Sequence, residues 1–291
     1  VINLVDGVAV VADHFWTAKK ARDALDIKWL VGAAGSVSSE SVARALELGT
    51  GKAAPIAREN GDVAAGLKGA SKTLEARYEL PMLAHVALEP MNCLALVANG
   101  TCDIWTSTQF PEGAEAAAAA RSGVKPEAVR IHPQFIGGGF GRRLETDAIG
   151  QAAAIAKAMP GVPVKLIWTR EDDTTHDFYR PASLHTLEGS LDKAGNLVAL
   201  HHRMVSPSAT ARAFPAFVQD GIDPFMVEGA ANLTYAVPHF RTSVLIQDTG
   251  VRVGYWRSVS NALNAFAFES FMDELAVAAG KDPVAFRLAL L

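Results

Sequence analysis

The hydrophobic residues of this 291-residue chain recur with two different periods. Apolar residues three or four positions apart predict helices, and alternating apolar and polar residues predict strands. Helical spacing covers residues 15–26, 39–48, 62–70, 111–121, 147–159 and 264–280. Strand patterns cover residues 8–12, 27–31, 73–80, 129–135, 163–169 and 242–247, with two further strands between 182 and 206. Helices and strands interleave irregularly, which indicates an α+β fold.

Polar turns join several of the predicted strands. Asn99-Gly100 separates residues 94–97 from residues 102–105, and this dipeptide predicts a hairpin with a type I′ turn. Residues 192–196 predict a second strand-to-strand turn. Residues 52–61 show no clear period and are expected to be irregular.

Composition excludes several classes of protein. The chain is 49% hydrophobic and 20% charged, which is typical of a globular protein with a buried core. Its net charge of −4 gives no electrostatic support for binding nucleic acid. No apolar run reaches the roughly 18 residues of a transmembrane helix. Cys93 and Cys102 are too few for an iron–sulfur cluster, so both are expected in the core, with a disulfide between them as the alternative.

The strongest chemical signal is the run Gly-Gly-Gly-Phe-Gly-Arg-Arg over residues 137–143. Glycines allow positive φ angles and let a ligand approach the backbone N–H groups closely. The arginines add permanent charge, so the run fits an anionic, oxygen-rich ligand. A dinucleotide-binding loop is excluded because it needs glycine at position 142, and a P-loop is excluded because no Gly-Lys-Ser/Thr follows. A tight turn between a strand and a helix remains the alternative.

Further motifs lie in a fixed order on both sides of this run. They are Tyr78-Glu79-Leu80-Pro81, His85, Leu88-Glu89-Pro90, Thr108-Gln109-Phe110-Pro111, Trp168-Thr169-Arg170-Glu171-Asp172, Tyr179-Arg180-Pro181, Tyr255-Trp256-Arg257-Ser258-Val259 and Gly280-Lys281-Asp282-Pro283. Together they resemble the molybdenum-binding large subunit of the xanthine dehydrogenase/aldehyde oxidase family. The Gly-Arg-Arg and Tyr-Trp-Arg-Ser-Val sequences resemble one branch, the isoquinoline 1-oxidoreductase β subunits and membrane-associated aldehyde dehydrogenases.

This resemblance implies a molybdenum-cofactor-binding domain. Residues 1–34 would be the tail of an α/β hammerhead domain, residues 35–72 a connecting segment, and residues 73–291 the first, truncated part of the cofactor-binding domain. The complete enzyme would oxidise a C–H bond of an isoquinoline-like N-heteroaromatic or of an aldehyde, with oxygen derived from water. It would hold a molybdenum–pterin cofactor, expected as molybdopterin cytosine dinucleotide, and pass electrons to [2Fe–2S] clusters on a small partner subunit. A cytochrome c subunit is a further candidate partner.

The resemblance also implies roles for individual residues. The glycine loop, formed by Gly137, Gly138, Gly139, Phe140 and Gly141, would lie against the cofactor. Gln109 and Arg257 are the implied catalytic residues beside the metal. Trp256 and Tyr255 would form a wall of the site. An amide side chain can both donate and accept a hydrogen bond, and an arginine can offset the charge of an anionic cofactor. No side chain is expected to ligate the metal directly, and the family's general-base glutamate is not expected within this chain.

Three positions leave alternatives or depart from the family pattern. Arg142 and Arg143 could pair with cofactor phosphates or with nearby Glu145 or Asp147, and Arg142 is counted among the candidate cofactor-binding residues. Leu144 stands where purine hydroxylases have a substrate-orienting glutamate. An apolar heteroaromatic or an aldehyde is therefore expected to fit better than a purine.

Other polar positions are expected to be structural. His85 and Glu89 lie four residues apart, but no third metal ligand is in view. His201 and His202 are consecutive in a predicted strand, so their side chains should point to opposite faces. Residues 170–173 are expected to form a solvated charge cluster, and the family resemblance implies that they order a loop.

Two other functions stay open. A non-catalytic binding or assembly module that retains the family fold would carry the same motifs. A Gly-x-Gly-Glu motif in the rest of the polypeptide would favour the enzyme over the module. A nucleotide-binding protein would rest on the glycine run alone. The compartment is also open, since periplasmic, membrane-associated and cytoplasmic locations in a bacterium all fit.

We predict that residues 1–291 alone neither turn over substrate nor retain the cofactor. The implied general base and part of the cofactor-binding surface are expected to lie outside these residues. Activity assays with a heteroaromatic substrate and elemental analysis for molybdenum test this expectation. Robust hydroxylation, or stoichiometric molybdenum, in the purified segment would contradict it.

Overall fold

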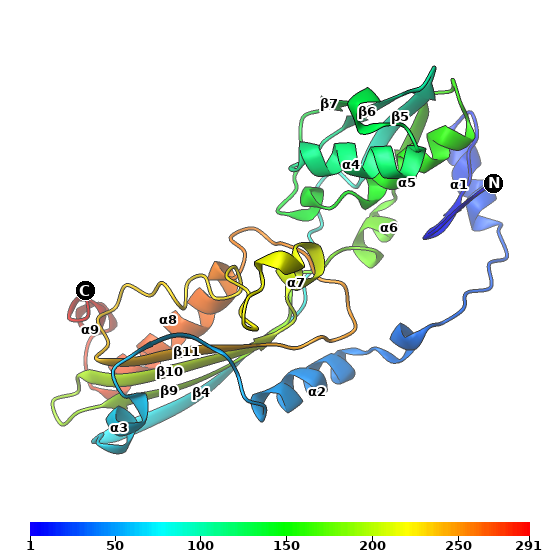
Figure 1. Ribbon diagram of the computed structural model, residues 1–291. Helices are drawn as coiled ribbons and strands as arrows, with labels where there is room; N and C mark the ends of the chain where they lie inside the picture. Colours follow the sequence, from blue (N-terminus) through cyan, green and yellow to red (C-terminus); the bar gives the residue numbers. More distant parts are fainter. The chain divides into compact units, whose positions relative to one another are not determined.

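The computed structural model describes residues 1–291, apart from the side chain of Ala33. The chain forms two compact units, each built from two stretches of sequence. Unit 1 comprises Val1–Gly32 and Ala84–Phe178, and unit 2 comprises Ala33–Leu83 and Tyr179–Leu291 (Figure 1). The sequence-based division at residues 34 and 72 stays a prediction.

Unit 1 is built around a four-stranded sheet with the order β7-β6-β5-β8. The strands are β5 (Asn92–Ala98), β6 (Thr101–Thr106), β7 (Val129–Pro133) and β8 (Val164–Ile167). Helices α4 (Pro111–Ser122) and α5 (Asp147–Ala158) lie side by side against this sheet (Figure 1). Their buried residues are mostly alanines, such as Ala118 and Ala152, which let the two helices approach each other closely.

Smaller elements complete unit 1. They are β1 (Ile2–Leu4), β2 (Gly7–Ala9), α1 (Phe15–Asp23), α6 (Arg170–Thr175), and short 3₁₀ helices over Pro126–Ala128 and Arg142–Leu144. The predicted hairpin is confirmed, because β5 and β6 pair around Asn99 and Gly100 with φ angles of 51° and 80°. Cys93 and Cys102 are free, buried thiols, and burial raises the pKa of Cys93 to about 12.

Unit 2 contains a five-stranded sheet with the order β3-β11-β10-β9-β4. Its strands are β3 (Ile56–Asn60), β4 (Lys72–Leu80), β9 (Ser183–Leu191), β10 (Leu197–Ser206) and β11 (His239–Ile246). Helix α8 (Asn261–Ala278) packs on one face through side chains such as Phe271, which meets Leu187 and Leu200 in the core. Helices α2 (Ser39–Thr50) and α3 (Val63–Lys68) contact the other face, where Gly66 lies against Ala199.

The remaining elements of unit 2 are short. They are α7 (Ala209–Ala213), α9 (Pro283–Leu288), and 3₁₀ helices over Ala33–Ser36 and Pro215–Phe217. Among the residues that the structure describes, no helix is both long and apolar enough to cross a membrane.

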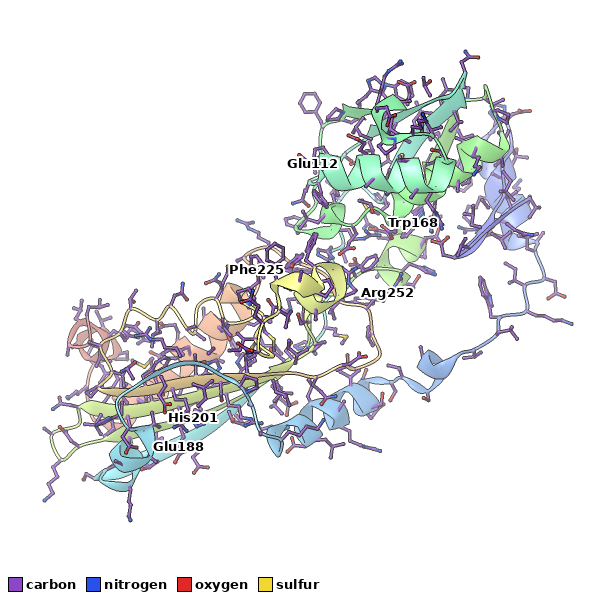
Figure 2. All side chains as sticks on the ribbon, viewed as in Figure 1. Glu112, Trp168, Glu188, His201, Phe225 and Arg252 are labelled. Carbon is purple, nitrogen blue, oxygen red and sulfur yellow. The ribbon has the colours of Figure 1, made fainter. Side chains whose placement is uncertain are left out.

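A row of buried polar side chains crosses the sheet of unit 2. His185 Nδ1 lies 2.9 Å from His202 Nε2, and His185 Nε2 lies 2.9 Å from the hydroxyl of Ser183. His202 is fully buried, whereas its neighbour His201 is half-buried on the opposite face and pairs with Glu188 of β9 (Figure 2). The expectation that the two consecutive histidines face opposite ways is confirmed. No group of three or more potential metal ligands occurs among the described residues.

Three sequence-based expectations for elements are wrong. Residues 27–31 form no strand and are exposed, because a β-prone segment needs a neighbouring strand to pair with. Residues 52–61 contain strand β3, whose register is set by pairing with β11 rather than by its own pattern. Residues 170–173 begin helix α6, which is capped by Thr169, and Asp173 within it is buried instead of solvated.

We predict that the stability of the chain falls as pH drops from about 6.5 towards about 3. Burial lowers the pKa of His202 to about 3 and lowers that of His185 well below its usual range. The unfolded chain therefore binds protons in this window while the folded chain does not, so His202 alone costs about 2 kcal/mol between pH 7 and pH 5. Denaturant unfolding against pH measures the slope.

The variant His202→Gln should flatten this pH dependence, and His14→Gln, at an exposed position, should leave it unchanged. Parallel profiles for the wild type and His202→Gln would contradict the prediction.

Candidate functional site

The glycine loop of unit 1 has a backbone that most residues could not adopt. Gly138 and Gly141 have φ angles of 92° and 105°. Phe140 between them also has a positive φ, 56°, which costs energy for a residue with a side chain. Its ring is 43% exposed, so burial of the ring does not explain this conformation.

The other glycines of the loop lie close to side chains from other segments. A Cβ atom on Gly139 would lie 2.6 Å from Oε1 of Gln109, and a Cβ atom on Gly137 would clash with the side chain of Glu89. Each of these glycines therefore brings the loop backbone against a side chain from another segment. The sequence predicted the need for small residues here but not which neighbours impose it.

Gln109 lies directly beside the loop. Its Oε1 accepts a hydrogen bond from the N–H of Gly141 at 3.2 Å, and its own backbone N–H donates to the carbonyl of Arg143 at 2.9 Å. This bond fixes the amide so that Nε2, a donor with no protein acceptor among the described residues, remains available. The backbone N–H groups of Gly139 and Phe140 likewise donate to no protein acceptor. The arrangement offers several uncharged donors in one place, which suits an oxygen-rich ligand.

Arg143 and Glu89 form a clamp behind the loop. The buried guanidinium of Arg143 donates from Nε to the carbonyl of Gly138 at 2.7 Å and from Nη2 to Oε2 of Glu89 at 2.7 Å. The same Glu89 oxygen accepts the N–H of Gly137 at 3.1 Å. Burial raises the pKa of Glu89, but the hydrogen bond from Asn92 and the charge of Arg143 outweigh it, so the net shift is downward and the carboxylate is ionised.

Arg142 is held in a separate buried cage. Its two terminal nitrogens each donate to an oxygen of Asp147 at 2.9 Å, and its Nε lies 3.1 Å from Oδ1 of Asp177. The guanidinium carbon lies 5.4 Å from the ring centre of Trp168 and 5.5 Å from that of Phe178. The sequence left phosphate and carboxylate as alternative partners of Arg142, and in the structure its side chain pairs with carboxylates. Arg142 therefore supports the loop from behind, through ion pairs with these carboxylates.

His85 belongs to this cage and not to a metal site. Its Nδ1 lies 3.0 Å from both carboxylate oxygens of Asp177, and both side chains are buried. Burial raises the pKa of Asp177, but the hydrogen bond from His85 and the charge of Arg142 outweigh it and give a net lowering. Glu89 bonds to Arg143 instead, so the two residues of the His-x-x-x-Glu motif serve different ion pairs.

Trp256 and Arg257 lie in unit 2, at a turn that precedes α8. Arg257 is exposed, and the two residues after it, Ser258 and Val259, have φ angles of 64° and 50°. A β-branched residue in this region is strained, and such strain is common at functional sites. The guanidinium of Arg180 lies 5.9 Å from the ring centre of Trp256.

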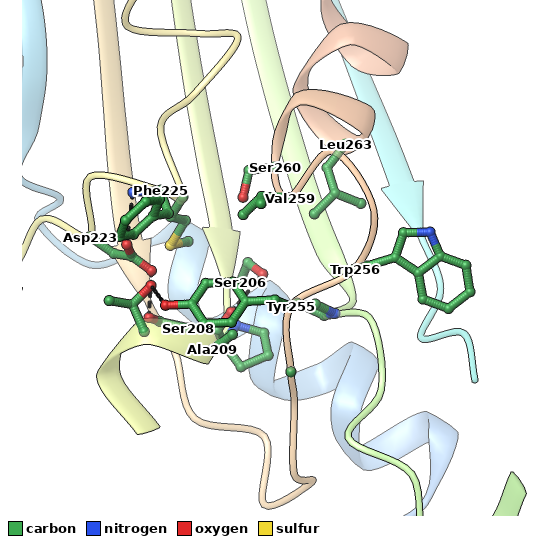
Figure 3. A pocket seen from close by; sticks show the side chains of 15 residues that line it. Ser206, Ser208, Ala209, Asp223, Phe225, Tyr255, Trp256, Val259, Ser260 and Leu263 are labelled. Carbon is green, nitrogen blue, oxygen red and sulfur yellow. Dashed lines mark hydrogen bonds between the residues drawn. The ribbon is translucent and has the colours of Figure 1, made fainter. Parts of the chain in front are cut away.

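A small pocket in unit 2 lies next to this turn. Tyr255 points into it and donates from its hydroxyl to Oγ1 of Thr210 at 2.9 Å, while Trp256 points away (Figure 3). Ser208 donates to the buried carboxylate of Asp223 at 2.6 Å on the same side. Sequence reasoning missed Ser208, Thr210 and Asp223, because they come from segments with no recognisable motif.

The structure thus brings together part of the predicted site. Gln109 and the loop residues 137–141 are in contact within unit 1, while Trp256 and Arg257 belong to unit 2. Sequence reasoning also missed Asp177, which anchors both Arg142 and His85. Its only signal was its position two residues before the Tyr179-Arg180-Pro181 motif.

Comparison with known proteins gives a consistent result. A family model described as "Molybdopterin cofactor-binding domain" matches residues 49–290. The chain is 32% identical over 294 residues to the membrane-bound aldehyde dehydrogenase [pyrroloquinoline-quinone] of Gluconacetobacter polyoxogenes, covering 98% of this chain and 38% of that protein. It is 31% identical over 310 residues to isoquinoline 1-oxidoreductase subunit beta of Brevundimonas diminuta, covering 100% of this chain and 39% of that protein.

A solved structure supports the fold. Quinoline 2-oxidoreductase from Pseudomonas putida 86 aligns with a TM-score of 0.71 at 15% identity, over 95% of this chain and 36% of that chain. The chain therefore spans 38–39% of the length of the two curated relatives.

We predict that Arg142→Ala destabilises the folded chain by about 3–5 kcal/mol, because it leaves the buried carboxylates of Asp147 and Asp177 without their cation. The matched control is Arg130→Ala, which removes an arginine that is 62% exposed and 3.6 Å from Asp103. That change should cost at most about 1 kcal/mol. Denaturant unfolding of both variants measures the difference, and equal losses would contradict the assignment of Arg142 to the buried support of the loop.

Proposed function

Because this chain belongs to the molybdopterin cofactor-binding domain family, we propose that it is a segment of the large subunit of a molybdenum hydroxylase. The proposed subunit is of the xanthine dehydrogenase/aldehyde oxidase type. Support comes from the two curated relatives, which match nearly all of this chain at 31–32% identity. The activity, substrate and partners of the complete protein are part of the proposal.

The residues of unit 1 fit one side of such a cofactor. The N–H groups of Gly139 and Phe140 and the amide of Gln109 are donors without protein acceptors. These donors carry no net charge, so they can hold an oxygen ligand whatever its protonation state. This donor set, fixed beside a loop that a Cβ would obstruct, is the single observation that carries the proposal.

The roles of the individual residues follow from their chemistry. Gln109 and residues 137–141 would bind the oxygen ligands and orient the reacting group. Arg257 would place a permanent positive charge against the anionic cofactor, and Trp256 would exclude water. When bound, the cofactor would supply the two-electron oxidation of a substrate C–H bond. Arg142 would act only by holding the loop in place.

The substrate we propose is an isoquinoline-like N-heteroaromatic or an aldehyde. The names of the two relatives point to these two classes. Leu144 also supports an apolar substrate, because it puts a hydrocarbon side chain where a purine would need a hydrogen-bonding group. Electrons would leave through [2Fe–2S] clusters of a small partner subunit, with a cytochrome c subunit as a further acceptor. The cofactor would be the cytosine dinucleotide form.

We predict that Gln109→Ala in the complete enzyme lowers kcat by about 10²–10³-fold, the usual cost of removing one fixed donor that stabilises the transition state. Gln134→Ala is the matched control, since the side-chain amide of this exposed glutamine donates to the neighbouring carbonyls of His132 and Pro133. Steady-state kinetics and molybdenum content test both variants. A complete, folded enzyme that contains no molybdenum would instead favour a non-catalytic module.

A further inference from the structure

The glycine loop is flexible by composition, but its donors need one fixed geometry. Glycine-rich backbone samples many conformations, yet the donors of this loop can serve one ligand only if they keep one geometry. The loop also contains Phe140 in a left-handed conformation, which relaxes unless its surroundings prevent it. Some group outside the loop must therefore impose the conformation.

Arg143 is the residue with the contacts to do so. Its side chain donates to the carbonyl of Gly138 inside the loop, and Nη2 also reaches the carbonyl of Glu89 at 2.9 Å. Its own carbonyl accepts from the N–H of Gln109 at 2.9 Å. One residue thus connects the loop, the Glu89 segment and the Gln109 segment, which are far apart in sequence.

Glu89 completes the connection from the other side. Its Oε2 accepts from both Arg143 and the N–H of Gly137, and its backbone N–H donates to the carbonyl of Gly137 at 2.9 Å. The pair therefore fixes a carbonyl and an N–H on consecutive residues, Gly137 and Gly138. Rotation of either peptide plane would break a charge-assisted hydrogen bond.

The geometry requires these residue types. Arg143 uses Nε for one acceptor and Nη2 for another, and a lysine ammonium has a single nitrogen that cannot span both. A glutamine at position 89 would keep the size of the side chain but lose the charge that pairs with the buried guanidinium. Arg143 is 1% exposed, so water cannot replace that charge.

We propose that Arg143 and Glu89 are positioning residues, which act on the reaction through the loop donors and Gln109 without touching substrate or cofactor. This inference rests on the proposed function. The ion pair of Arg143 and Glu89 sets the geometry of the loop N–H donors and of Gln109, and through that geometry it sets kcat.

The test uses Arg143→Lys and Glu89→Gln in the complete enzyme. Each should lower kcat by about 10–100-fold, as is typical when a group that orients a metal site is lost. KM and molybdenum content should stay within about threefold, because ground-state binding is not removed. Hydrogen exchange of the peptide covering residues 137–145 should become faster, while peptides from unit 2 keep their wild-type rates.

The matched controls are Arg241→Lys and Glu59→Gln. They change an arginine–glutamate pair of the same chemistry, which joins β11 to β3 in unit 2. Both should leave kcat and exchange of the loop peptide as in the wild type.

The outcomes separate this inference from the proposed function. Unchanged loop exchange, unchanged kcat, or faster exchange throughout the protein in Arg143→Lys and Glu89→Gln would overturn the positioning role. A wild-type enzyme without molybdenum and without turnover would overturn the proposed function. The exchange experiment would still decide whether the clamp fixes the loop.

Discussion

Burial of consecutive arginine charges is the constraint on which the candidate site depends. Arg142 and Arg143 are each 1% exposed, so both need carboxylate partners inside the protein. Those partners, Asp147 and Asp177 for the first and Glu89 for the second, come from three different segments. Pairing of the two charges therefore fixes three segments around one loop. They are helix α5, the segment after α6 that contains Asp177, and the segment before β5 that contains Glu89.

This constraint explains how a glycine-rich segment can be rigid. Glycine is favoured at Gly138 because φ is positive, and a Cβ at Gly139 would displace the Gln109 amide that accepts the N–H of Gly141. The entropy that such residues would retain is removed by bonds to the loop backbone from Glu89 and Arg143. Donors held in this way need no rearrangement to meet developing charge, which is the condition for electrostatic stabilisation of a transition state.

Each unit carries some of the residues that the family resemblance implies to act. Unit 1 holds the donor array, and unit 2 holds Trp256 and Arg257 on a strained turn before α8. In both units, residues with positive φ angles lie at or beside the residues implied to act. Each unit also contains a sheet, four-stranded in unit 1 and five-stranded in unit 2. Strained turns persist where the surrounding structure over-determines them.

The sequence by itself determined the α+β class, most helices, the Asn99-Gly100 hairpin and the importance of residues 137–143, because these follow from local periodicity and backbone chemistry. It also gave the family, since ordered motifs persist along the chain. Only the tertiary structure showed that residues 27–31 lack a strand partner, that β3 pairs with β11, and that Arg142 pairs with Asp147 and Asp177. Strand pairing and the burial of charge depend on segments distant in the sequence, so local patterns carry no record of them.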